Sequence, residues 1–131
     1  PDLSLSITPT SSSSKVLISA DVSSASTSNP YPNRFRFVRD GVAIALADAD
    51  VANNAQCSFM GTSYSSTLGP TSNGMSYLDS TAVVAGTPVV YKLQCSNTSN
   101  VGIYINRGYA SAPASQYSRA ISTLIATEIP Q

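Results

Sequence analysis

The stretch NRFRFVRDGVAIAL, residues 33–46, decides the fold class because it combines a turn signal with an alternating pattern. Asp40 and Gly41 form an Asp-Gly pair, and both residue types tolerate the positive φ that a two-residue type I′ turn requires. With these two residues in the loop, Arg39 pairs with Val42. The stretch therefore predicts an antiparallel hairpin.

The register of this hairpin places large apolar side chains on one face of the sheet. Phe37 faces Ile44, and Phe35 faces Leu46. A buried sheet face selects this arrangement, because side chains alternate between the two faces of a strand. The opposite face carries Arg34, Arg36, Val38, Ala43, Ala45 and Ala47.

The rest of the chain has the pattern of short strands separated by turn clusters, with no long run of apolar residues at helical spacing. Such a pattern is typical of an all-β, antiparallel two-sheet β-sandwich of the jelly-roll sort, and a single-sheet barrel is the alternative. A chain of 131 residues normally builds one core, so we expect residues 1–131 to form a single domain. The expected strands, about nine in number, are Leu3–Thr8, Lys15–Ser23, Asn33–Arg39, Val42–Asp48, Gln56–Gly61, Met75–Asp79, Val89–Ser96, Val101–Arg107 and Arg119–Ile129.

A second hairpin is expected to join the segments around Leu93 and Ile103. The turn-forming residues 96–100 separate two alternating apolar sets. An odd loop length pairs Leu93 with Ile103 and keeps both sets on one face. The sets are Tyr91, Leu93 and Cys95 on the first strand, and Val101, Ile103 and Ile105 on the second.

Charge is scarce, since charged residues make up 11% of the chain and the net charge is zero. Ser and Thr make up about a quarter of the residues, so hydroxyl groups must provide much of the solvation. The seven basic residues are scattered along the sequence, which makes nucleic acid an unlikely partner. No apolar run approaches the ~20 residues of a membrane helix, and we expect neither membrane insertion nor a signal peptide.

Several segments, in their order along the chain, resemble a widespread domain of phage virion proteins found in tail fibres and tailspikes. The resemblance extends from about Lys15 to Ile129 and implies a virion surface protein, usually oligomeric, that attaches to the host or decorates the particle. Residues 83–88 depart from it, being more apolar than the polar linker expected there. The resembling segments are Arg39-Asp40-Gly41, Leu78-Asp79-Ser80, Tyr91-Lys92-Leu93-Gln94, Ile103-Tyr104-Ile105-Asn106-Arg107 and Ser122–Ile129.

This resemblance favours a fibre or tailspike domain that binds host-surface polysaccharide. The alternative is a capsid-decorating protein that holds shell subunits together and binds no receptor. In both cases we expect other virion proteins as partners and a location on the tail or capsid surface of the virion.

Catalytic and metal-binding patterns are weak. The chain contains no His, which removes the commonest general base and excludes a Ser-His-Asp triad. Asp40 is better explained by its turn, and Asp79 by the end of its strand. The segment from Asp48 to Asn54 has oxygen ligands, but their spacing fails the calcium-loop pattern. We therefore expect no enzyme activity, no metal and no cofactor.

The two cysteines, Cys57 and Cys95, both fall in strand-like stretches. Buried free thiols are the simpler interpretation, because free Cys is among the most buried residue types. A disulfide between two strands is the alternative and would require an oxidising compartment.

Tyrosines and the C-terminal strand supply the candidate contact residues. Exposed Tyr side chains suit contact with sugars or proteins, and four of them fall in expected loops. Few charges and many strand edges favour a closed homotrimer. The loop tyrosines are Tyr31, Tyr64, Tyr109 and Tyr117, and the expected interface residues are Ile121, Leu124 and Ile129.

Overall fold

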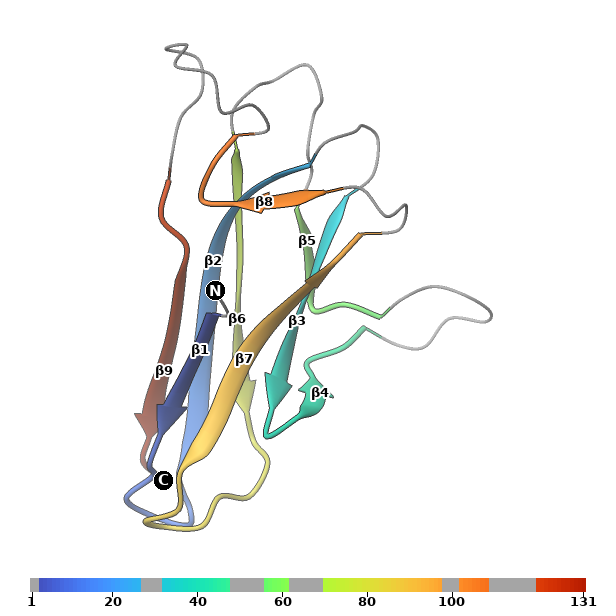
Figure 1. The fold of residues 1–131 in the computed structure, drawn as a ribbon. Coiled ribbons are helices and arrows are strands. Elements are labelled where there is room, and N and C mark those ends of the chain that lie inside the picture. The colour runs from blue at the N-terminus through green and yellow to red at the C-terminus, as the bar shows by residue number, and fades with distance from the viewer. Residues whose placement is uncertain (1–2, 27–31, 48–55, 62–69, 98–101, 109–119) are drawn as a thin grey trace.

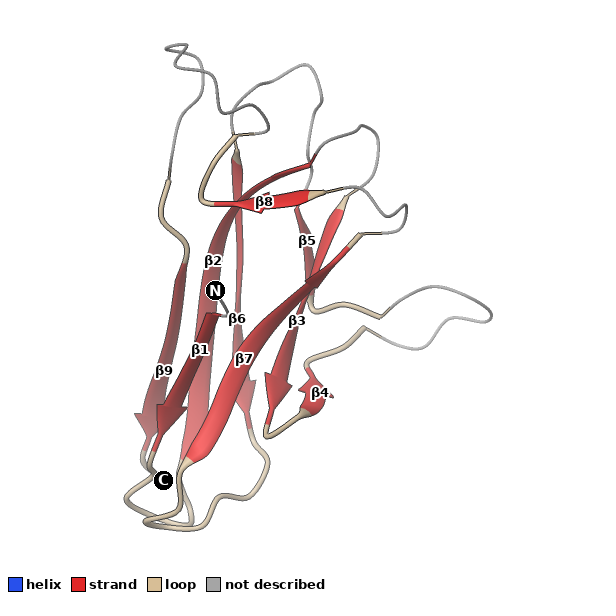
Figure 2. Ribbon diagram, in the orientation of Figure 1, coloured by secondary structure: helices blue, strands red, loops and turns tan. Residues whose placement is uncertain are grey.

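The computed structural model describes residues 3–26, 32–47, 56–61, 70–97, 102–108 and 120–131. These residues form nine strands and no helix, arranged as two antiparallel sheets (Figures 1 and 2). The two-sheet sandwich expected from the sequence is therefore confirmed. The strands are β1 (Leu3–Ile7), β2 (Lys15–Ser26), β3 (Asn33–Arg39), β4 (Val42–Ile44), β5 (Phe59–Gly61), β6 (Thr71–Asp79), β7 (Val89–Ser96), β8 (Ile103–Ile105) and β9 (Thr123–Ile129).

The first sheet has five strands in the order β1-β7-β3-β4, with β5 also paired to β3. Strands β4 and β5 share one edge of β3, because β4 pairs with its last residues and β5 with its first. The second sheet has four strands and is built around β2, which pairs with β6 along one edge. Strands β9 and β8 pair with successive parts of β2.

The hairpin between β3 and β4 has the predicted turn and, over its first pairs, the predicted register. Asp40 and Gly41 both have positive φ, at 46° and 90°, as a type I′ turn requires. Arg39 pairs with Val42 and Phe37 with Ile44. The agreement is expected, because both the turn and the alternation are local signals.

The predicted pairing of Phe35 with Leu46 is wrong. Ala45 has a φ of 53°, which turns the chain away after Ile44, and Phe35 pairs with Phe59 of β5. Ser58 supports this exchange of partners, since its backbone N–H donates to the Phe35 carbonyl at 2.7 Å. Its hydroxyl accepts a hydrogen bond from the Phe37 N–H at 3.0 Å.

The second predicted hairpin is also wrong. At Leu93, β7 already pairs with Leu3 of β1 on one edge and with Phe37 of β3 on the other, so this residue has no free edge for Ile103 of β8. Strand β8 instead pairs with the end of β2, where Ile105 lies opposite Ser24. The chain therefore crosses from one sheet to the other between β7 and β8.

The core lies between the two sheets and draws on both. Strand β2 contributes Val16, Ile18 and Ala20, and the five-stranded sheet contributes Phe37 and Tyr91. Each of these side chains is at most 5% exposed. Burial of a large apolar side chain stabilises the fold by about 1.5–3 kcal/mol, so this cluster determines which face of each strand points inward.

Candidate functional site

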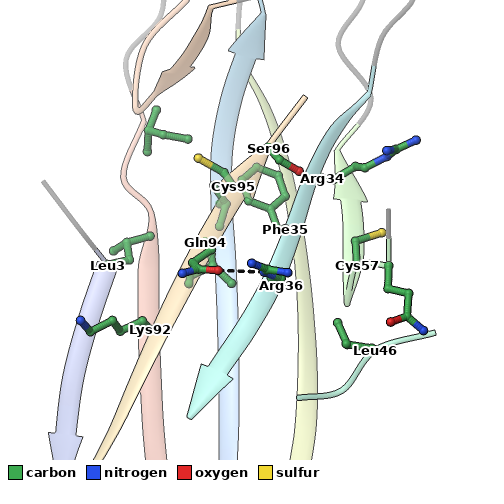
Figure 3. Close-up of a pocket in the computed structure, with 14 residues that line it drawn as sticks. Leu3, Arg34, Phe35, Arg36, Leu46, Cys57, Lys92, Gln94, Cys95 and Ser96 are labelled. Atoms are coloured by element: carbon green, nitrogen blue, oxygen red, sulfur yellow. Dashed lines mark hydrogen bonds between the residues drawn. The ribbon is translucent and has the colours of Figure 1, made fainter. Parts of the chain in front are cut away.

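A cavity of about 660 Å³ lies on the five-stranded sheet (Figure 3). Its lining runs across the width of the sheet, from Leu3 on β1, over β7 and β3, to Leu46 and Cys57 beyond the far edge of β3. Its lining comes from both faces of this sheet, because Arg34, Arg36 and Lys92 point outward whereas Phe35 and Leu93, with Val22 of β2 and Ile105 of β8, line a part that lies between the sheets. We call it the outer-face cavity after its outward-facing part, and the volume of the whole lies within the range of ligand sites in proteins. It is lined by Leu3, Val22, Arg34, Phe35, Arg36, Leu46, Gln56, Cys57, Lys92, Leu93, Gln94, Cys95, Ser96 and Ile105.

The alternation of β3 directs Arg34 and Arg36 to the outer surface of the sheet. Phe35 and Phe37 are buried at 1% and 0% exposure, so the residues between and beside them must point the other way. Arg36 lies opposite Gln94 of β7, and its Nε donates to the Gln94 side-chain oxygen at 2.8 Å. Figure 3 shows these two side chains meeting across the strands.

Lys92 reaches the same surface from β7. It lies between Val38 of β3 and Ser4 of β1, so it is a diagonal neighbour of Arg36. Such neighbours are about 7–8 Å apart, close enough for their charges to act on one ligand. Among the described residues, neither the two arginines nor Lys92 forms an ion pair. The sequence could not reveal this grouping, because the strand register brings Lys92 and the arginines together.

Both cysteines line the outer-face cavity, and both are free thiols. Cys57 is partly buried and Cys95 is exposed, so the expectation of two buried thiols is wrong for Cys95. Partial burial against the cavity wall raises the pKa of the Cys95 thiol. The thiol is therefore protonated near neutral pH and is a weak nucleophile.

A second cluster of ionisable groups joins the two sheets. The Asp79 carboxylate at the end of β6 accepts hydrogen bonds from Arg39 at 3.0 Å and from the Tyr91 hydroxyl at 2.7 Å. The Thr81 N–H donates to its other oxygen at 3.0 Å, which is the strand-end role expected for Asp79. Arg39 also donates to the Thr81 and Ala82 carbonyls.

The environment of this cluster keeps Asp79 ionised. Burial alone would raise the pKa of Asp79, but hydrogen bonds from Thr81 and Tyr91 and the charge of Arg39 outweigh it, so the pKa lies below 3.8. Burial and the Asp79 carboxylate raise the pKa of Tyr91. A carboxylate that is held ionised by three donors cannot also serve as a general acid near neutral pH. We infer that the cluster holds the two sheets together.

The four tyrosines predicted as ligand contacts lie outside the described residues. The adjoining strand ends are described, and register places them together, since Asn33 lies opposite Gly61 and Ser24 opposite Thr71. Arg34 lies opposite Ser96 at the same end of the sandwich. The tyrosines in question are Tyr31, Tyr64, Tyr109 and Tyr117.

The predicted interface residues fall in three different settings. Ile121 is 81% exposed, whereas Leu124 packs against the core from the inner face of β9. Ile129 lies opposite Lys15 on the outer face of the four-stranded sheet. Sequence reasoning missed Ile125, which is 54% exposed on that outer face. The alternation of residues 123–129 between the two faces of β9 is the sequence signal that could have identified Ile125.

Metal binding finds no support in the part of the chain that the structure describes, where no three His, Cys, Asp or Glu residues lie close enough to hold an ion. The oxygen-rich segment 48–55 lies outside that part. No helix within the described ranges is long and apolar enough to cross a membrane.

The chain matches no protein-family model, and no curated protein sequence is significantly similar to it.

Proposed function

We propose that this chain is a non-enzymatic structural domain of a phage virion, of the tail-fibre or tailspike type, which attaches the particle to glycans on the host surface. The proposal begins from the resemblance of ordered segments between Lys15 and Ile129 to such domains.

The observation that carries the proposal is the cluster formed by Arg39, Asp79 and Tyr91. These residues come from three of the resembling segments, and they meet in one buried network that joins the two sheets. The network gives the resembling segments a shared structural role, because it holds the two sheets of the sandwich together.

The arrangement of the sandwich also supports attachment. A rigid scaffold that gathers its connections at one end is the usual platform for binding loops in β-sandwiches. The described ends of β2 and β5, and the beginnings of β3 and β6, lie at one end. The residues that connect them include Tyr31 and Tyr64.

Adsorption to cells tests this function. Fluorescently labelled protein is mixed with a panel of bacterial strains, and bound protein is measured after washing. We expect the protein to bind a subset of strains. This binding should be lost when the sugar rings of the surface polysaccharide are cleaved by periodate oxidation. Failure of the folded protein to bind any strain, combined with labelling of the phage head by antibodies against the chain, would replace attachment with capsid decoration.

The exposed apolar side chains of the four-stranded sheet favour capsid decoration as the second candidate. Ile125 and Leu78 are 54% and 44% exposed, and both lie on the outer face. Such a surface suits contact with other virion subunits. Antibody labelling of the tail would contradict this candidate.

A further inference from the structure

The outer-face cavity concentrates positive charge on a protein with no net charge. Arg34, Arg36 and Lys92 are three of the seven basic residues of the chain, and all three line this cavity. None of them forms an ion pair within the described residues, whereas Arg39, on the inner face of the same strand, pairs with Asp79. Like charges on neighbouring strands repel, so this grouping does not stabilise the fold and points to an anionic ligand.

The charges are spread across the sheet, which favours an extended ligand over a small anion. Figure 3 shows Lys92 on the β1 side, Arg36 beside Gln94 at the centre, and Arg34 directed toward the β5 side. A compact anion can bridge two adjacent groups, such as Arg36 and Lys92, but it cannot span all three. A polymer that carries repeated negative charges can cross the strands and meet all of them.

The remaining polar groups of the cavity suit a sugar polymer. Gln56, Gln94 and Ser96 supply amide and hydroxyl groups that can hydrogen-bond to sugar hydroxyls. Binding of single-stranded nucleic acid relies on exposed aromatic side chains that stack on bases. Phe35 is the single aromatic residue in the described lining, and it is 1% exposed. The cavity therefore fits a polysaccharide better than a nucleic acid.

We propose that the outer-face cavity binds an acidic, carboxylate-bearing polysaccharide, with Arg34, Arg36 and Lys92 as its charge contacts. The inference rests on the proposed function and specifies the glycan class. It places a binding surface on the side of the sandwich, on the outer faces of β3 and β7. Arg36 is already oriented by Gln94, so its guanidinium N–H groups other than Nε remain available for a carboxylate.

Binding of defined polymers to the whole chain tests the proposal. The probes are polygalacturonate, which carries carboxylates, dextran sulfate, neutral dextran and single-stranded poly(dT). We expect polygalacturonate to bind, neutral dextran not to bind, and the polygalacturonate Kd to rise about tenfold between about 50 and about 300 mM salt. The double variant Arg34→Gln/Arg36→Gln should weaken polygalacturonate binding by about tenfold or more.

The matched control is Lys15→Gln/Arg107→Gln, which removes the same charge from positions outside the cavity lining. Its polygalacturonate Kd should stay within about twofold of wild type, and thermal unfolding should show that both variants are folded. If the two double variants weaken polygalacturonate binding equally, the effect depends on net charge alone and the proposal is overturned. Tighter binding of poly(dT) or of dextran sulfate than of polygalacturonate would overturn the glycan class.

The same variants separate this inference from the function on which it rests. If wild-type protein adsorbs to bacterial cells and Arg34→Gln/Arg36→Gln adsorbs equally well, the cavity proposal is wrong and attachment stands. If wild-type protein binds neither cells nor any of the polymers, both proposals are wrong. Loss of cell adsorption in this variant alone, together with loss of polygalacturonate binding, is the result that supports both.

Discussion

At the scale of single residues, Asp79 is a buried, ionised side chain in the described part of the chain. Its side chain is 1% exposed and carries a charge, which is tolerated because Arg39, Tyr91 and Thr81 all donate to it. The sequence placed Asp79 at a strand end but could not supply its partners. Arg39 and Tyr91 are 40 and 12 residues away, and only the packing of one sheet on the other brings them together.

Replacing Asp79 with Asn should lower the free energy of unfolding by about 3 kcal/mol, because it leaves the Arg39 guanidinium largely buried with only the exposed Asp40 carboxylate, at 3.8 Å, as a counter-ion. Urea unfolding at neutral pH measures the change. Asp21→Asn is the matched control, since Asp21 is exposed on the outer face of β2, and its effect should stay within about 0.5 kcal/mol. Equal effects at both positions would show that the buried network contributes little.

The pKa of Asp79 predicts how this difference depends on pH. Because the folded-state pKa lies below the ordinary value of 3.8, the carboxylate contributes stability that is fully present above that value. The contribution is lost as the pH falls through the folded-state pKa. The gap between wild type and Asp79→Asn should therefore be constant from about pH 7 to about pH 5 and narrow below about pH 4. All other carboxylates are present in both proteins. A difference in the free energy of unfolding that stays constant down to about pH 2 would therefore contradict the assignment of this contribution to Asp79.

At the scale of elements, prediction succeeded where the signals were local. The Asp40-Gly41 turn and the alternation beside it fixed the first pairs of the β3–β4 hairpin. Prediction failed for Leu93 and Ile103, because the pairing of β8 depends on which edges are occupied elsewhere. A sequence window around residues 91–105 contains no information about β1 or β2.

The faces of β3 can be distinguished by mutation. Phe35→Ala and Phe37→Ala should each lower the free energy of unfolding by about 3–5 kcal/mol, because both rings are almost fully buried. The Phe35 ring stacks on Phe59, and the Phe37 ring is tilted against it. Arg36→Ala should change the free energy of unfolding by less than about 0.5 kcal/mol, since Arg36 is exposed on the opposite face. Chemical denaturation of the three variants measures this. Similar losses for all three would contradict the register.

Gly74 marks a close approach between β6 and β2. A Cβ at this position would lie 2.5 Å from the Ala20 carbonyl oxygen, which belongs to the backbone of the central strand and cannot move cheaply. Gly74→Ala should therefore destabilise the protein by about 1–3 kcal/mol through overpacking, although alanine usually suits a strand better than glycine. Gly86→Ala provides a comparison, because nothing lies within 4 Å of its added Cβ and only its φ of 76° opposes the change. A neutral or stabilising Gly74→Ala, measured by thermal unfolding, would show that the strands can separate without cost.

At the scale of the whole molecule, the sandwich presents two chemically different outer surfaces. The five-stranded sheet exposes the cations of the outer-face cavity beside Met60, which lies opposite Arg34 and is 56% exposed, and the four-stranded sheet exposes Ile125 and Leu78 among hydroxyl groups. Composition predicted the hydroxyl-rich character of the surface, but the grouping of cations on the five-stranded sheet could not be predicted. It depends on which strands are neighbours, and neighbours such as β3 and β7 are distant in sequence.

The expected homotrimer can be related to the exposed apolar side chains on the outer face of the four-stranded sheet. We propose that copies of the chain associate through this face, because exposed apolar side chains on β9 and β6 lose contact with water when a neighbour covers them. Ile125→Asp should then convert the trimer into a folded monomer, since Ile125 is 54% exposed and its replacement leaves the core intact.

Leu124→Asp is the contrasting variant on the adjacent residue. Leu124 is partly buried and packs against the core, so a carboxylate there should unfold the protein rather than dissociate it. Light scattering at micromolar concentration gives the mass of wild type and of each variant, and circular dichroism reports folding. A wild-type monomer would end the trimer proposal, and a trimeric Ile125→Asp would move the interface to another face. A folded monomer for Leu124→Asp would show that the inner and outer faces of β9 are exchanged relative to the register described here.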